Sequence, residues 1–113
     1  MFNKTFEVEM FKPVVKFFKS LEKSKYAELM HLVELLKKHG YNISKEYPKA
    51  FHRLKGANNR ELLQIQYDDL RILFFWVKNK AILLHGFYKK SNSTKATDIK
   101  VAVERMKDYL NSI

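Results

Sequence analysis

The segment from Leu70 to Lys90 places the strongest constraint on the fold of this chain. It reads LRILFFWVKNKAILLHGFYKK, in which two apolar runs flank a short polar stretch around Asn79–Lys80. Each run has the length of a β-strand, and the connection is too short for anything except a hairpin. The segment therefore predicts two antiparallel strands, with Arg71 at the start of the first and two lysines at the end of the second.

The remaining elements follow from hydrophobic periodicity. Alternating apolar and polar residues predict strands, whereas apolar residues three or four apart predict helices. Between Tyr41 and Asn59 neither pattern holds, so we expect a loop with one short strand near Phe51–Leu54. Thr94 or Thr97 can cap the last helix. The other predicted elements are strands at Thr5–Met10, Leu62–Tyr67, Arg71–Lys78 and Ala81–Lys89, helices at Pro13–Leu21 and Ser24–His39, and a final helix with Ile99, Ala102, Val103, Met106 and Leu110 facing inward.

These elements come in the order βααβββα and predict an α+β fold in one domain, residues 1–113. Hairpins at Asp68–Asp69 and Asn79–Lys80 would join three of the strands into an antiparallel meander. We expect this antiparallel sheet to pack against an N-terminal helical hairpin and a C-terminal helix.

The last strand of the meander is apolar on both faces. Strict alternation places Leu83, His85, Phe87 and Lys89 on one face and Ile82, Leu84, Gly86 and Tyr88 on the other. A strand that is apolar on both sides is central and covered on both sides. Only its C-terminal end is then free to meet a ligand.

Charge indicates the kind of partner. The chain has 113 residues and a formal net charge of +10, so its surface attracts polyanions such as RNA, DNA or an acidic protein. It has no cysteine, which rules out disulfides and thiolate metal sites. The longest apolar run, 72–77, is far short of the roughly 20 residues that a membrane helix needs. We expect a soluble, cytoplasmic protein without a membrane partner.

Cofactor and metal chemistry find no support in the sequence. None of the nucleotide-binding, nucleophile-elbow or zinc-protease motifs occurs, and the three glycines are isolated. The four histidines do not have metal-ligand spacing with carboxylates. We therefore expect neither a metal ion nor a small-molecule cofactor.

The cations at the strand ends are the most informative functional feature. Arg71 begins one strand and Lys89–Lys90 end its neighbour, so antiparallel pairing brings them to the same sheet edge. Such a cluster can neutralise a phosphate while RNA is cut by its own 2′-hydroxyl, without a metal. The reaction also needs a group that exchanges protons. His52, His85, Tyr88 or a lysine could do so, although His85, between Leu83 and Phe87 on an apolar strand, fits a hydrogen-bonded core histidine better than a catalyst.

The residues from Glu61 to Leu110 resemble a known family. The strand LRILFFW, the strand LLHGFYKK and the helix motif A-x-x-R-x-x-D-Y, at Ala102, Arg105, Asp108 and Tyr109, are similar to the RelE/ParE superfamily of bacterial toxins. The similarity is greatest to its HigB-like, phage-associated branch. It implies a type II toxin that cleaves mRNA on the ribosome and is neutralised by a helix-turn-helix antitoxin.

The resemblance also implies roles for individual residues. Arg71 is similar to the arginine that contacts the scissile phosphate, and Lys89 with Lys90 to the basic pair after the last strand. Gln64 and Gln66 stand where the family usually presents arginine or lysine. The predicted catalytic residues are Arg71, Lys89, Lys90 and His85, and the predicted RNA-binding residues are Arg53, Lys55, Arg60, Gln64, Gln66 and Tyr88.

Two other functions remain open at this level. The chain could be a ParE-like inhibitor of DNA gyrase, which acts by binding. It could also be a basic RNA-binding or regulatory module without chemistry, which Gln64 and Gln66 would suit.

Overall fold

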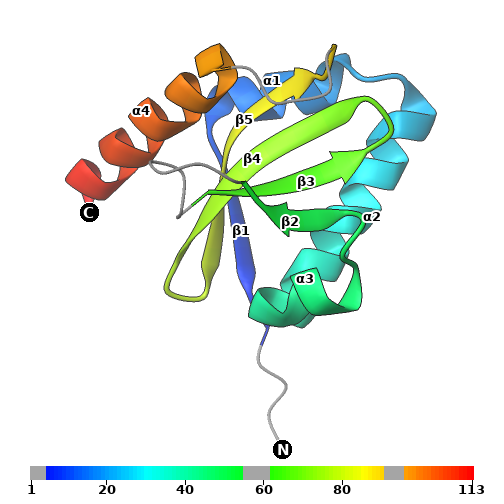
Figure 1. Cartoon of the computed structure of the whole chain (residues 1–113), viewed down its shortest axis with the longest axis horizontal. Coiled ribbons are helices and arrows are strands. Elements are labelled where there is room, and N and C mark those ends of the chain that lie inside the picture. Colours follow the sequence, from blue (N-terminus) through cyan, green and yellow to red (C-terminus); the bar gives the residue numbers. More distant parts are fainter. Residues whose placement is uncertain (1–4, 55–61, 91–95) are drawn as a thin grey trace, which may run out of the picture.

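A five-stranded sheet lies at the centre of the molecule (Figure 1), in a computed structural model that describes residues 5–54, 62–90 and 96–113. The strand order is β1-β5-β4-β3-β2. Strands β3, β4 and β5 form the antiparallel meander that the sequence predicts. The bounds are β1 Glu7–Met10, β2 Phe51–Arg53, β3 Leu63–Tyr67, β4 Leu70–Val77 and β5 Lys80–Tyr88.

The sheet is mixed rather than wholly antiparallel. Strand β2 pairs antiparallel with β3, but β1 pairs with β5 in parallel, Glu7 lying opposite Lys80. The prediction of an antiparallel sheet is therefore wrong for β1. Among the described residues, three α-helices, a 3₁₀ turn and strands β2, β3 and β4 lie between β1 and β5, and such a long connection lets the chain return in the same direction.

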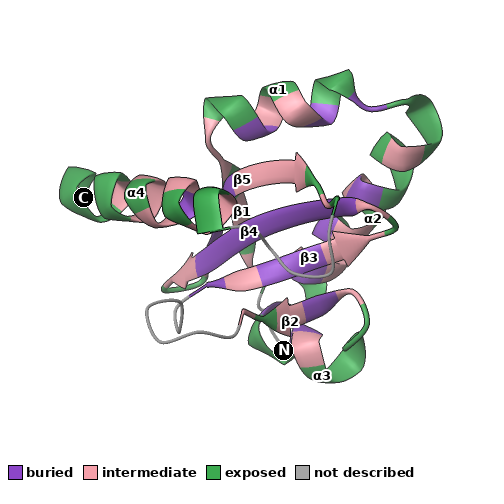
Figure 2. Cartoon of the chain, turned by 45° about the horizontal axis from the view of Figure 1, so that its top comes forward, coloured by how far each residue is buried: buried purple, intermediate pink, exposed green. Residues whose placement is uncertain are grey.

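Helices cover both faces of the sheet. Helices α1 (Lys12–Ser20) and α2 (Lys23–His39) lie on one face, and α4 (Ala96–Ser112) lies on the other (Figure 1). α1 contacts β5, whereas α2 contacts β1 and β3. Figure 2 shows that β4, between the two layers, is buried along most of its length. The predicted α+β fold, with helices from both ends of the chain, is confirmed.

Each face of the sheet has its own apolar core. The larger core lies under α1 and α2, and the smaller under α4. The larger contains Val14, Phe18, Leu29, Val33, Leu36, Ile65, Ile72, Phe74 and Leu83. The smaller contains Leu62, Leu73, Phe75, Ile82, Leu84 and Ala102. Burial of these side chains is the main favourable term in folding.

Helix α2 ends at Gly40, as its sequence predicts. The backbone N–H of Gly40 donates to the carbonyl of Leu36, and its φ of 59° lies in the left-handed region that favours glycine. A Cβ at this position would also collide with the ring of Phe6. A 3₁₀ turn, η1 (Gly40–Asn42), and a short helix, α3 (Ile43–Glu46), follow in the stretch expected to be a loop.

A β-bulge in β5 overturns the predicted alternation. His85 pairs with Leu73, but Leu83 pairs with the next residue, Phe74, so that Leu84 is extra. Leu83 therefore packs in the larger core, whereas His85 contacts α4. Beyond the bulge the faces are exchanged, and Gly86 lies against Phe17 of α1.

Helix α4 differs from the prediction at both ends. Thr97 lies inside the helix and does not cap it, and Thr94 is outside the described residues. Leu110 is 48% exposed, and the ring of Tyr109 packs against Phe11 and Phe75 instead.

Within the described part of the chain, every helix is too short or too polar to cross a membrane.

Candidate functional site

Polar side chains gather on the face of the sheet that α4 only partly covers. In β3, Ile65 faces the larger core, so Gln64 and Gln66 face the α4 side. Two cross-strand rows result. One contains Gln66, Arg71 and Phe87, and the next contains Gln64, Leu73 and His85. We define the polar cluster as His52, Gln64, Gln66, Arg71, His85 and Asp98.

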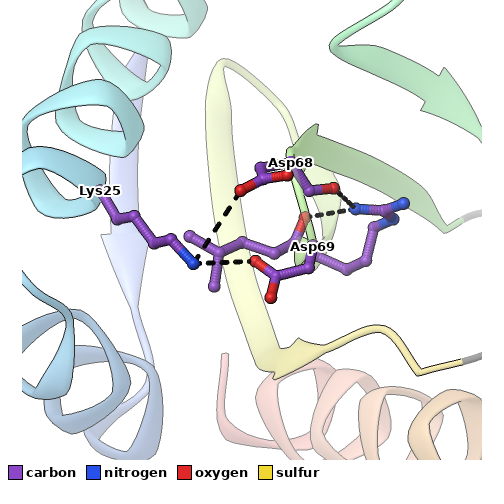
Figure 3. Close-up of polar contacts among 5 residues, drawn as sticks. Lys25, Asp68 and Asp69 are labelled. Carbon is purple, nitrogen blue, oxygen red and sulfur yellow. Dashed lines mark hydrogen bonds and ion pairs between the residues drawn. The ribbon is translucent and has the colours of Figure 1, made fainter.

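Arg71 is the central cation of the polar cluster. Only 6% of its surface is exposed, and its Nη1 donates to the carbonyl of Asp68 at 2.7 Å and to that of Leu70 at 2.8 Å (Figure 3). Burial lowers the pKa of the guanidinium from its usual value, although the carboxylates of Asp69 and Asp68 act to raise it. Arginine is not deprotonated in proteins, so the group remains charged at neutral pH.

The Nε of Arg71 is buried and has no hydrogen-bond partner among the described residues. A buried N–H without an acceptor costs free energy, and more so when it belongs to a charged group. An anion at this position would remove that cost. Arginine suits phosphate in particular, because its planar N–H groups match two phosphate oxygens.

His85 is paired with a carboxylate. Its Nε2 lies 2.8 Å from Oδ1 of Asp98, in the first turn of α4, and its ring stacks on Phe87. His85 is thus half-buried and partnered, rather than a fully buried core histidine. It is diagonal to Arg71 across β4 and β5, a relation that places the two residues roughly 7–8 Å apart. Both side chains start from the same face of the sheet.

A second histidine lies on the other side of the polar cluster. The Nε2 of His52 is 2.9 Å from Oε1 of Gln66, and Gln66 is directly opposite Arg71. Gln64, which is directly opposite His52 on β3, is buried. These amides can donate and accept hydrogen bonds but carry no charge.

The predicted meeting of Arg71 with the terminal lysines at one sheet edge is confirmed. The backbone N–H of Lys89 donates to the carbonyl of Asp69 at 2.7 Å, in the turn just before Arg71. Lys90 follows and is exposed.

Two predicted RNA-binding residues lie away from the polar cluster. Tyr88 is on the opposite face of the sheet, where its ring contacts Phe17 and lies 5.6 Å from Nζ of Lys25. Arg53 is exposed and lines a cavity of about 410 Å³ with Trp76. Lys55 and Arg60 are outside the described residues.

Two residues of this region were not predicted as site residues. Asp98 is the acidic residue in the first turn of α4. Arg105 donates from Nη1 to the carbonyl of Leu84, the bulge residue, at 2.8 Å. The motif that contains Arg105 pointed to a role, but only the bulge explains what it does. Among the described residues, no three histidines or carboxylates gather as ligands for a metal ion.

The fold is that of the RelE toxins. The chain is similar to one chain of the archaeal RelE–RelB complex from Pyrococcus horikoshii OT3, with 22% identity, a TM-score of 0.59, and coverage of 75% of this chain and 96% of that one. It is also similar to a chain of the toxin–antitoxin complex RelBE2 from Mycobacterium tuberculosis, with 10% identity, a TM-score of 0.53, and coverage of 77% and 94%.

The family follows from the sequence match. Residues 16–107 match the model of the family described as phage derived protein Gp49-like (DUF891), and the chain belongs to that family. No curated protein sequence matches the chain. The expected relation to the RelE superfamily, in a phage-associated branch, is confirmed.

Proposed function

We propose that this protein is the toxin of a type II toxin–antitoxin system and that it cleaves mRNA bound to the ribosome. One observation carries the proposal. The buried guanidinium of Arg71, with an Nε that lacks an acceptor among the described residues, lies diagonal to the His85–Asp98 pair. A phosphate-binding cation beside a proton-exchanging group is what cleavage by the 2′-hydroxyl requires.

The proposed reaction assigns a role to each member of the polar cluster. His85 takes the proton of the 2′-hydroxyl, whose oxygen attacks the neighbouring phosphorus. The bond to the 5′-oxygen breaks, leaving a 2′,3′-cyclic phosphate, and water supplies a proton to the leaving oxygen. Arg71 neutralises the charge that builds up on the phosphate oxygens. Asp98 keeps the imidazole oriented and stabilises its protonated form.

The surrounding charges support an RNA substrate. Lys89 and Lys90 lie at the same sheet edge as Arg71 and can contact the phosphates on either side of the cleaved bond. The net charge of +10 favours approach to ribosomal RNA. Gln64, Gln66 and His52 offer hydrogen bonds to bases or sugars. Arg53 and Tyr88 would then contact RNA outside the polar cluster, and Lys55 and Arg60, which are outside the described residues, would bind RNA as well.

The proposed partner is an antitoxin. The two solved structures described above are complexes of a toxin with its antitoxin, and a strongly basic chain needs an acidic or mixed segment to neutralise it. We expect a helix-turn-helix antitoxin encoded beside this protein, and action in the cytoplasm, where ribosomes are found.

The test is to map transcript ends after the protein is induced in growing cells, and to repeat cleavage with purified protein, mRNA and ribosomes. Wild-type protein should arrest growth and cut mRNA only when ribosomes are present. Arg71→Met, which keeps the apolar stem, should be inactive while circular dichroism shows that it is folded. Lys16→Met, which removes an exposed charge on α1, is the matched control and should stay active.

Two results would overturn the proposal. DNA-damage signalling without transcript cleavage would indicate a gyrase inhibitor. RNA binding with a steep salt dependence and no product would indicate a module without chemistry.

A further inference from the structure

The turn between β3 and β4 connects the polar cluster to the opposite face of the molecule. The backbone of this turn, at Asp68, accepts a hydrogen bond from Arg71. Its side chains point to α2, where Nζ of Lys25 lies 3.1 Å from Oδ1 of Asp69 and 3.9 Å from Oδ2 of Asp68 (Figure 3). One turn thus holds the guanidinium through its backbone and Lys25 through its carboxylates.

These carboxylates are potential competitors for Arg71. They are near enough to raise the pKa of its guanidinium, and arginine pairs readily with carboxylates. Yet among the described residues no carboxylate lies within ion-pairing distance of Arg71. Lys25 pairs with both instead. The hydrogen bond to Asp69 raises the pKa of Lys25, so the ammonium is fully charged at neutral pH.

The turn also holds the end of β5, where Lys89 begins the terminal lysine pair. Asp68 has a φ of 54°, in the left-handed region, so its conformation depends on the contacts around it. The carbonyl of Asp69 accepts the backbone N–H of Lys89. A change in this turn would therefore displace both Arg71 and the start of the Lys89–Lys90 pair.

We infer that Lys25 is a positioning residue for Arg71, because it binds the carboxylates of Asp68 and Asp69 and so keeps the guanidinium available for a phosphate. The inference rests on the proposed function for its effect on RNA, but its geometric basis does not. Without the ammonium, Asp69 or Asp68 would be free to turn toward Arg71 and occupy the position of the substrate phosphate.

The experiment compares three variants for cleavage and thermal unfolding. Lys25→Met removes the ammonium and keeps the apolar stem, and Lys23→Met removes an exposed charge from the same helix as the control. Lys25→Met should cut more slowly by about tenfold, the scale expected when a catalytic group is misplaced by less than an ångström. Adding Asp69→Asn to Lys25→Met should restore the rate to within about threefold of wild type, because the main competitor is then neutral. A merely structural role for Lys25 does not predict that rescue.

A second readout does not depend on cleavage. The ¹⁵N-edited spectrum contains the Nε–H signal of Arg71, which is assigned by its loss in Arg71→Lys. This signal should shift in Lys25→Met and return in the variant with Asp69→Asn, while Lys23→Met leaves it unchanged. If Lys25→Met cleaves like Lys23→Met and the signal does not shift, the inference is wrong. If wild-type protein does not cleave but the signal behaves as described, the proposed function fails and the positioning of Arg71 by Lys25 stands.

Discussion

The Nε2 of His85 and the Oδ1 of Asp98 lie 2.8 Å apart, joining strand β5 to the first turn of α4. Their side chains are 18% and 21% exposed, so the contact is only partly screened by water. The bulge at Leu84 makes this contact possible, because it turns His85 to the α4 face. Arg105 supports the bulge by binding the carbonyl of Leu84.

Replacing Asp98 should slow the proposed cleavage without unfolding the protein. In Asp98→Asn the imidazole loses the carboxylate that orients it and stabilises its charged form, so we expect the rate to fall by about 10²-fold. The measurement is single-turnover cleavage of mRNA on ribosomes. Glu104→Gln, at an exposed position on the same helix, is the control and should cleave at the wild-type rate.

The two residues should act as one unit. His85→Ala alone and His85→Ala combined with Asp98→Asn should be equally slow, because Asp98 acts only through the imidazole. If the two effects multiply instead, Asp98 has a separate role.

The meander could be predicted from the sequence, but the direction of His85 could not. Two apolar runs separated by a short polar stretch predict a hairpin, because the connection between the strands is too short for any other arrangement. Alternation along a strand, however, holds only while every residue is paired. The extra residue, Leu84, is as apolar as its neighbours, and nothing in its side chain marks a bulge.

The part of the candidate site that depends on strand pairing alone could be predicted from the sequence. Arg71 and Lys89 had to share an edge, because neighbouring antiparallel strands begin and end together, and the structure confirms this. Asp98 could not be placed, since its contact with His85 depends on how α4 crosses the sheet. Lys25 was not assigned a role for the same reason: its partner Asp69 lies 44 residues away along the chain.

A lysine in place of Gln66 should strengthen RNA binding and make it more sensitive to salt. Gln66 lies directly opposite Arg71, so the new ammonium would add a phosphate contact beside the guanidinium. Each added contact to single-stranded RNA makes the slope of log K against log salt steeper by about 0.7. The measurement is binding of a short single-stranded RNA at several salt concentrations. Gln66→Met, which adds no charge, should leave the slope unchanged.

A methyl group at Gly86 should destabilise the fold. An added Cβ would lie 2.5 Å from Cδ2 of Phe17 and 3.0 Å from Cδ1 of Ile72, closer than side chains pack. Overpacking of this kind costs about 1–3 kcal/mol, so Gly86→Ala should lower the free energy of unfolding by that amount. Urea denaturation measures it. Phe17→Leu removes the nearest ring atoms, and Gly86→Ala should cost less in that background. An equal cost in both backgrounds would show that the ring is not the cause.

The ion pair between Lys80 and Glu9, which ties β5 to β1, should make stability depend on pH in the alkaline range. Nζ of Lys80 lies 3.3 Å from Oε1 of Glu9, and this hydrogen bond is the main cause that raises the pKa of Lys80 above 10.5. A raised folded-state pKa means that the stabilisation is fully present below pH 10.5 and is lost as the pH rises through the folded value. Wild type should therefore exceed Lys80→Met in free energy of unfolding at about pH 9, and the difference should shrink by about pH 11.5. Urea titrations of both proteins at the two pH values give this difference directly. A gap that stays constant, or widens at the higher pH, would mean that the ammonium does not stabilise the fold through Glu9.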